Sequence, residues 1–371
     1  MFIRWAVEHQ PILLIRETQG HRSIFGAPPE KRSENEIISF KCVSVSIEQA
    51  TNRPILETFL RLDEEIYELE KQCPGPRLSI VEAWIKYLVS KQTLSNNDII
   101  QLPLHMLDDE YNEEQNLAKY SKMTRLESDI ESLTKLTEKL NVINDATQAA
   151  KYEEFLANIS RRYIENCNEV LIEEILEHAQ KRCDELRERW TKLRSKYNEL
   201  DALIGSVTSN DYVNPNEVKL DAQLESARQI RDKLGGTAEQ WRTSANLLST
   251  SAKSAMVASE QYRLIENTDS LNGKITLAMD CRSSILGSII AFKCGQEALP
   301  QVEIPCITNR QIVAVSHANE YLLTDIVNAE RYQHTKTVLE TYRKSLSDSV
   351  AWLNNVFQNT LRKDLHEAEE A

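Results

Sequence analysis

Apolar residues recur along much of the chain at alternating spacings of four and three positions, the pattern of helices that pack in coiled coils. The stripe is most regular over residues 172–204 and again over residues 332–356. In each segment the apolar positions keep to one helix face while charged residues occupy the others. The pattern predicts an all-α protein, an elongated antiparallel coiled coil or long-helix bundle with a small N-terminal helical head.

The two regular stripes are the candidate coiled-coil interface. Trp190 falls on the first stripe, so we expect it to be a core residue rather than an exposed stacking surface. The predicted interface residues are Ile172, Leu176, Cys183, Leu186, Trp190, Leu193, Tyr197 and Leu200 in the first stripe, and Leu339, Tyr342, Leu346 and Leu353 in the second.

Helix-breaking residues are unevenly distributed along the chain. Residues 104–204 contain no Gly or Pro, and a single helix over about 113–204 would be roughly 140 Å long. A polar, Ala-rich stretch at 144–151 is the place where we expect any bend. Turn-forming residues gather at 205–215, and Gly235-Gly236 is expected to interrupt the helix that returns.

These signals divide the chain into five predicted segments. The second helix of the head is expected to start at the capping box formed by Ser79 and Glu82. The segments are a flexible or irregular lead at 1–45, a head of two short helices at 46–103, a long coiled-coil hairpin at 104–266 with its turn at 205–215, an irregular helical connector at 267–306, and a C-terminal coiled-coil helix with an acidic tail at 307–371.

The segment Thr243–Ser259 is rich in Ser and Ala, which let two helices approach closely. It predicts either tight packing within the protein or a groove that receives a partner helix.

The net charge of −13 disfavours nucleic acid and anionic membranes as main partners. About −7 of it falls on residues 104–204. Within this acidic segment, one stretch is rich in basic residues and is a candidate contact patch for an acidic surface. The alternative interpretation is that these residues flank the coiled-coil stripe and pair with acidic neighbours. The basic residues are Lys181, Arg182, Arg187, Arg189, Lys192, Arg194 and Lys196.

The motifs that would indicate an enzyme are missing from the sequence. It has no phosphate-binding Gly-rich loop, no H-E-x-x-H zinc motif and no G-x-S-x-G nucleophile motif. Its seven cysteines are widely spaced without a C-x-x-C pair, which favours reduced thiols in an intracellular compartment. With a mean hydropathy of −0.46, no stretch is expected to span a membrane. We expect no catalysis, cofactor or metal.

The sequence favours a non-catalytic coiled-coil scaffold subunit of a hetero-oligomeric assembly in the cytoplasm or nucleus. Architecture alone suggests a cytoskeletal setting, associated with microtubules, the spindle, the centrosome, a cilium or the kinetochore. Other coiled-coil subunits are the expected partners, in a homo- or hetero-oligomer. The alternatives are a BAR-like membrane-binding dimer and a vesicle-tethering coiled-coil protein.

Overall fold

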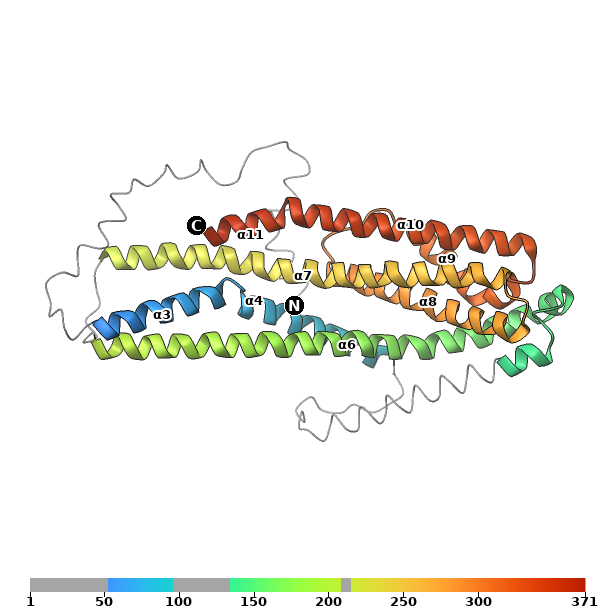
Figure 1. Ribbon diagram of the computed structural model, residues 1–371, viewed down its shortest axis with the longest axis horizontal. Helices are drawn as coiled ribbons and strands as arrows, with labels where there is room; N and C mark the ends of the chain where they lie inside the picture. Colours follow the sequence, from blue (N-terminus) through green and yellow to red (C-terminus); the bar gives the residue numbers. More distant parts are fainter. Residues whose placement is uncertain (1–52, 96–133, 208–214, 371) are drawn as a thin grey trace, which may run out of the picture. The chain divides into compact units, whose positions relative to one another are not determined.

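The computed structural model describes residues 53–95, 134–207 and 215–370, and every regular element in these ranges is an α-helix (Figure 1). The predicted all-α class is therefore confirmed. The chain divides into two units, 1–58 and 59–371, and the boundary falls within the first described helix. The second unit contains most of that helix and every later described one. Several predicted parts lie outside the described residues: the lead at 1–45, both ends of the head at 46–52 and 96–103, the start of the hairpin at 104–133, and the centre of the predicted turn at 208–214.

The helices follow one another in the order of the labels in Figure 1. They are α3 (Arg53–Glu70), α4 (Pro74–Ser95), α6 (Ala146–Val207), α7 (Pro215–Glu266), α8 (Leu271–Ala298), α9 (Asn309–Asp325), α10 (Ala329–Asn359) and α11 (Leu361–Glu370).

The main core lies where α7 packs against α8 and α10, with α9 and α11 completing it. Small residues on α7 and α8 let the two helices approach closely. A side chain at Gly295 of α8 would already touch Leu247 and Leu248 of α7, at 3.4 Å. Ser251 and Ala255 of α7 are likewise buried. The Ser- and Ala-rich stripe of Thr243–Ser259 thus packs against a helix of the same chain.

The two helices of the predicted head pack against the long helices. Helix α4 lies against α6 and α7. It starts at Pro74, because Cys73 adopts a left-handed backbone (φ 47°) and proline suits the first turn of a helix. The predicted start at Ser79 is wrong: Ser79 lies inside α4, and its hydroxyl donates to the carbonyl of Gly75 at 3.3 Å.

A helix running unbroken from 113 to 204 is excluded by a turn at residues 140–145. Asn141 has a positive φ of 52°, which ends the preceding helical turn at residues 134–139. Asp145 then caps α6, since its carboxylate accepts from the backbone N–H of Thr147 at 2.8 Å. This turn therefore overlaps the first residues of the polar stretch at 144–151, where the sequence predicts a bend.

Helix α7 continues through Gly235-Gly236, contrary to the predicted interruption. A Cβ on Gly235 would lie 2.6 Å from the Cβ of Cys73, whereas one on Gly236 would meet Ile80 only at 3.5 Å. The first glycine is needed because the turn between α3 and α4 packs directly on the backbone of α7.

The sequence predicts an irregular helical connector at 267–306, and residues 271–298 of it form one regular helix, α8. Its serine cap, Ser270, accepts from the backbone N–H of Gly273 at 3.4 Å. Among the described residues, Asn272–Ala298 is long and apolar enough to cross a membrane by length and composition alone. However, 67% of its most apolar stretch is buried inside the protein, as in the core helix of a bundle.

The C-terminal segment is three helices rather than one. Helix α9 begins with a capping box in which Thr308 and Gln311 exchange hydrogen bonds. Helix α9 ends at Asp325, and residues 326–328 connect it to α10. The side chain of Asn328 caps α10 by accepting hydrogen bonds from the backbone N–H groups of Glu330 and Arg331. A second break at Thr360 separates α10 from α11.

Candidate interaction surfaces

Helix α6 buries part of its predicted stripe against α4. Cys183 and Leu186 form a small apolar cluster with Leu78 and Val81 of α4. Leu193, one heptad beyond Leu186, is 3% exposed. The partner that covers this part of the stripe is thus the short helix α4, which lies between α6 and α7 in Figure 1.

The rest of the α6 stripe is less enclosed. Ile172, Leu176, Tyr197 and Leu200 are only half-buried. Trp190 is 39% exposed, contrary to the expectation of a core position. One edge of its ring rests on Gly75, where an added Cβ would come within 3.0 Å. The indole therefore covers the start of α4 with the remainder of the ring in solvent.

The stripe of α10 faces the core of the protein. All four of its predicted interface residues, Leu339, Tyr342, Leu346 and Leu353, are at most 2% exposed. They pack in the main core, where α10 lies against α7 and α9. This stripe is consequently occupied within the chain and offers no surface to another subunit.

Most of the candidate basic patch is held in contacts with other helices. Arg182 pairs with Glu239 at 2.9 Å, Arg187 with Glu82 at 3.2 Å and Lys196 with Glu65 at 3.1 Å. Arg189 donates to the side chain of Gln72 at 3.2 Å. Lys181 pairs with Glu177, one turn away on α6. These contacts match the alternative in which the cations pair with acidic neighbours.

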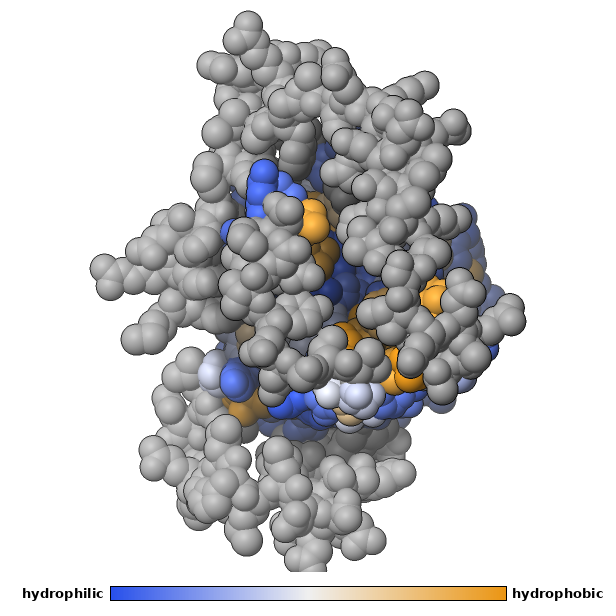
Figure 2. Space-filling model, turned by 90° about the vertical axis from the view of Figure 1, so that its left-hand side faces the viewer, coloured by the Kyte–Doolittle hydropathy of each residue, from blue (hydrophilic) through white to orange (hydrophobic). Residues whose placement is uncertain are grey.

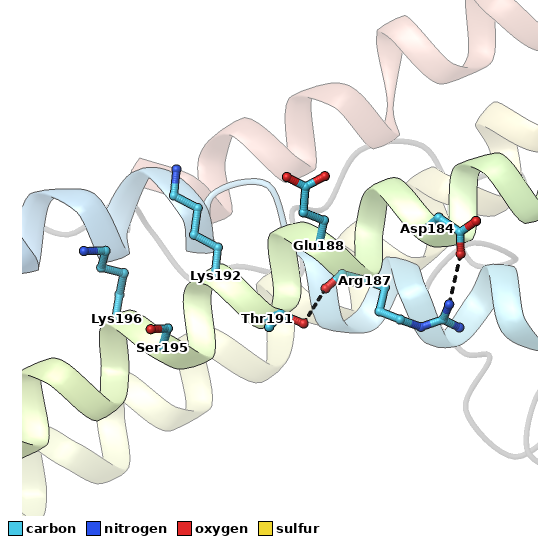
Figure 3. Close-up of a pocket in the computed structure, with 7 residues that line it drawn as sticks. All are labelled: Asp184, Arg187, Glu188, Thr191, Lys192, Ser195 and Lys196. Atoms are coloured by element: carbon cyan, nitrogen blue, oxygen red, sulfur yellow. Dashed lines mark hydrogen bonds and ion pairs between the residues drawn. The ribbon is translucent and has the colours of Figure 1, made fainter.

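Two cations of the patch remain. Within the described residues, Lys192 and Arg194 form no ion pair, and both are exposed. Lys192 lies in a shallow groove of about 630 Å³ along α6 (Figure 3). All the groove-lining residues come from that one helix: Asp184, Arg187, Glu188, Thr191, Lys192, Ser195 and Lys196. Two acidic, three basic and two hydroxyl side chains line the groove, and the surface of one helix does not enclose a small molecule.

Glu239 of α7 is the buried carboxylate that pairs with Arg182 of the patch. It is 1% exposed and contacts Arg182 of α6 and Arg242 of its own helix, each at 2.9 Å. Burial alone raises the pKa of Glu239, but the hydrogen bond and charge of Arg182 outweigh burial and hold the pKa below its ordinary value. Arg182 therefore ties α6 to α7 rather than serving an external partner.

The six described cysteines form no disulfide with one another, and five of them are buried. Burial raises the pKa of Cys281 well above its ordinary value and that of Cys294 to about 11. Thiols with such pKa values stay protonated at neutral pH and are poor nucleophiles. Among the described residues, no group of three His, Cys, Asp or Glu side chains is placed to hold a metal ion.

The first third of α7 carries an apolar face that the described part of the chain leaves uncovered; we call it the open α7 stripe. Leu220, Leu224 and Ile230 are 49%, 50% and 40% exposed. Further along the same helix, Trp241 and Leu248 are at most 3% exposed. The sequence showed the stripe, but only the structure shows that α8 and α10, which cover the later part of α7, do not cover its start (Figure 1).

Figure 2 looks toward the end of the described helices at which α7 begins, and hydrophobic and hydrophilic residues lie side by side among the coloured atoms there. In comparisons with known proteins, no family model, curated protein or solved structure matched this chain.

Proposed function

We propose that this chain is a non-catalytic scaffold subunit of a hetero-oligomeric intracellular assembly, in which its elongated antiparallel coiled coil associates with other helical subunits. A cytoskeletal assembly, associated with microtubules, the spindle, the centrosome, a cilium or the kinetochore, is the setting that we propose. This setting rests on the architecture alone. The partners are proposed to be coiled-coil proteins of the cytoplasm or nucleus.

The antiparallel arrangement is supported by the order of the contacts between α6 and α7. Tyr197 on α6 lies 3.4 Å from Arg228 on α7, and Arg182 lies 2.9 Å from Glu239. Residue numbers fall on one helix as they rise on the other, as expected of an antiparallel pair. Helix α4 packs against both helices. In this region the proposed coiled coil therefore contains three helices, α6, α4 and α7, rather than two.

The observation that carries the proposal is the open α7 stripe. Apolar side chains at heptad positions gain stability when a neighbouring helix removes them from water. On α7, neighbouring helices of the same chain bury Leu248, whereas Leu220 and Leu224 are half-exposed. A helix from another subunit, packed along the start of α7, would complete the coiled coil there.

The experiment is affinity purification of the full-length tagged chain from native extract, followed by native mass measurement. We expect recovery with other helical subunits in fixed stoichiometry. The substitutions Leu220→Asp and Leu224→Asp should reduce that recovery, because charge on the stripe cannot be buried against a partner. The control substitutions Ala222→Asp and Ser226→Asp add the same charge to exposed positions on the opposite face of the same segment and should not. Recovery of the wild-type chain only as a monomer would contradict the proposal.

The ion pairs of the basic patch weigh against the membrane-binding alternative. A membrane-binding surface needs several free cations, each worth about 1 kcal/mol at an anionic bilayer. Arg182, Arg187 and Lys196 are instead paired with carboxylates of other helices. Flotation with anionic liposomes at physiological salt tests this, and we expect no binding.

A vesicle-tethering role would use the same open α7 stripe. The identity of the co-purified subunits decides between a cytoskeletal setting and a vesicle-tethering one.

A further inference from the structure

Helix α3 presents an outer face on which apolar and acidic residues share one side. Leu60, Asp63, Glu64, Tyr67 and Glu68 follow one another at spacings of three and one, which places them on a single helix face. The side chains of Leu60 and Tyr67 are 56% and 52% exposed. The three acidic residues are exposed as well.

The orientation of this face is fixed by contacts on the other side of α3. Leu62 and Ile66 are buried, at 2% and 5% exposure. Glu65 reaches Lys196 of α6 at 3.1 Å. Glu70 reaches Arg231 of α7 at 3.0 Å. Helix α3 is thus docked by its inner face and both flanks, and the outer face is turned away from α6 and α7.

The charges on the two sides of α3 differ in what balances them. Glu65 and Glu70 are matched by cations of the long helices. By contrast, Asp63, Glu64 and Glu68 form no ion pair within the described part of the chain, although the nearby Arg61 pairs with Glu65. The outer face therefore combines two exposed large apolar side chains with three unbalanced negative charges.

We propose that the outer face of α3 binds a cationic amphipathic helix of a partner subunit. The apolar side chains of that helix would pack on Leu60 and Tyr67, and its Lys or Arg residues would lie against Asp63, Glu64 and Glu68. Charge complementarity selects this occupant, because an anionic bilayer, a nucleic acid or an acidic helix would be repelled. An Arg of the partner would also be attracted to the face of the Tyr67 ring. The proposal rests on the proposed scaffold function and gives the chemistry of one partner.

A designed peptide tests the surface directly. The probe is a fluorescent helical peptide of about three heptads with Leu at the a and d positions and Lys at e and g; its counterpart has Glu in place of Lys. Fluorescence anisotropy at physiological salt measures binding of each to the full chain. We expect the Lys peptide to bind and the Glu peptide not to bind. Equal binding of both peptides, or of neither, overturns the proposal.

Two variants of the full chain separate specific docking from general attraction to an acidic protein. Asp63→Lys/Glu64→Lys/Glu68→Lys should weaken binding of the Lys peptide by about tenfold or more, and Leu60→Ser/Tyr67→Ser should weaken it at unchanged charge. All five positions are exposed, so circular dichroism should show native helicity.

The matched control is Glu303→Lys/Glu340→Lys/Glu367→Lys, which makes the same charge change at exposed positions elsewhere. It should leave binding nearly unchanged. A control that loses as much affinity as the charge-reversed α3 variant, or a Leu60→Ser/Tyr67→Ser variant that binds like wild type, overturns the proposal.

Affinity purification from native extract distinguishes this inference from the proposed function. If the wild-type chain and the charge-reversed α3 variant recover the same subunits in equal yield, the α3 proposal fails while the scaffold function stands. If the wild-type chain recovers no other subunit, the scaffold function itself fails.

Discussion

The hydroxyls of Ser251 on α7 and Ser288 on α8 each donate a hydrogen bond to the main-chain carbonyl of the other residue, at 2.7 and 2.8 Å. Both side chains are fully buried. The hydroxyl of Tyr342 on α10 lies 3.3 Å from Ser288 Oγ and joins the third helix to the pair. Since each hydroxyl can reach the opposite carbonyl only at one alignment of the helices, this pair sets the register of α7 against α8.

Removing either serine hydroxyl should destabilise the bundle. We expect Ser251→Ala or Ser288→Ala to lower the free energy of unfolding by about 1 kcal/mol, because one buried hydrogen bond is lost. The double variant should cost less than the sum of the two, since both hydroxyls belong to one network. Urea denaturation followed by circular dichroism measures these values. Ser347→Ala, at an exposed position of α10, is the control and should be neutral.

The glycines of the long helices should respond differently to alanine. Gly235→Ala should cost about 1–3 kcal/mol, because the new methyl group would lie 2.6 Å from the Cβ of Cys73 and force α3 and α4 away from α7. Gly236→Ala meets Ile80 only at 3.5 Å, and Gly205→Ala meets nothing within 4 Å. These two should be neutral or gain up to about 1 kcal/mol from helix propensity. Thermal unfolding of the three variants checks the order, and a stable Gly235→Ala variant would contradict the close contact.

Two leucines of α7 should differ strongly in their contribution to folding. Leu248 is fully buried, so Leu248→Ala should cost about 2–5 kcal/mol through lost burial and the cavity that remains. Leu224 is half-exposed, and Leu224→Ala should change stability by no more than about 0.5 kcal/mol in the isolated chain. Urea denaturation of the purified chain measures both. Similar costs at the two positions would mean that the start of α7 is already covered within the chain.

Asp325 should make the protein less stable as the pH rises. Burial raises the pKa of this carboxyl, and the negative charge of Glu153 raises it further. The hydrogen bond from Thr335 and the positive charges of Arg331 and His317 lower the pKa, but they offset the rise only in part. Because the folded pKa lies above the unfolded value, the stabilisation is present in full below the unfolded pKa of about 4 and is lost as the pH rises through the folded value. Asp325→Asn should remove this loss and raise stability at neutral pH, measured as urea midpoints across about pH 3–8. An unchanged pH profile would count against the buried carboxyl as its source.

Glu239 should show the opposite pH dependence. Arg182 holds the folded pKa of Glu239 below its unfolded value, so its stabilisation is present above the unfolded pKa and is lost as the pH falls through the folded value. Glu239→Gln should cost about 3–5 kcal/mol at neutral pH, because Arg182 is left without its buried partner charge. The difference from wild type should shrink in acid. A cost that stays the same at low pH would contradict the ion pair as its origin.

The sequence was sufficient to predict helices and, on α10, the face that is buried. The repeat of Tyr332, Thr335, Leu339, Tyr342 and Leu346 is local, and all five side chains are buried in the core. On α6 the same kind of repeat correctly marked Cys183, Leu186 and Leu193 as buried positions. In both helices the repeat depends only on the 3.6-residue turn, which is encoded in neighbouring residues.

The partner of each face was decided by the tertiary structure. A heptad stripe specifies an apolar face but does not name the helix that covers it, and several stripes in this chain are interchangeable on pattern alone. Packing placed α4 against Cys183 and Leu186, which the heptad pattern alone assigns to a two-helix hairpin. It also left Leu220 and Leu224 half-exposed although their pattern resembles that of the buried positions.

The role of Gly235 likewise depends on a contact between residues 162 positions apart in sequence. Read locally, two adjacent glycines predict a helix break. In the structure the helix is continuous. At Gly235 the backbone of α7 lies so close to Cys73 that there is no room for a Cβ atom. Local periodicity thus determined which segments are helical, while close approach between distant segments determined which faces meet and which remain open.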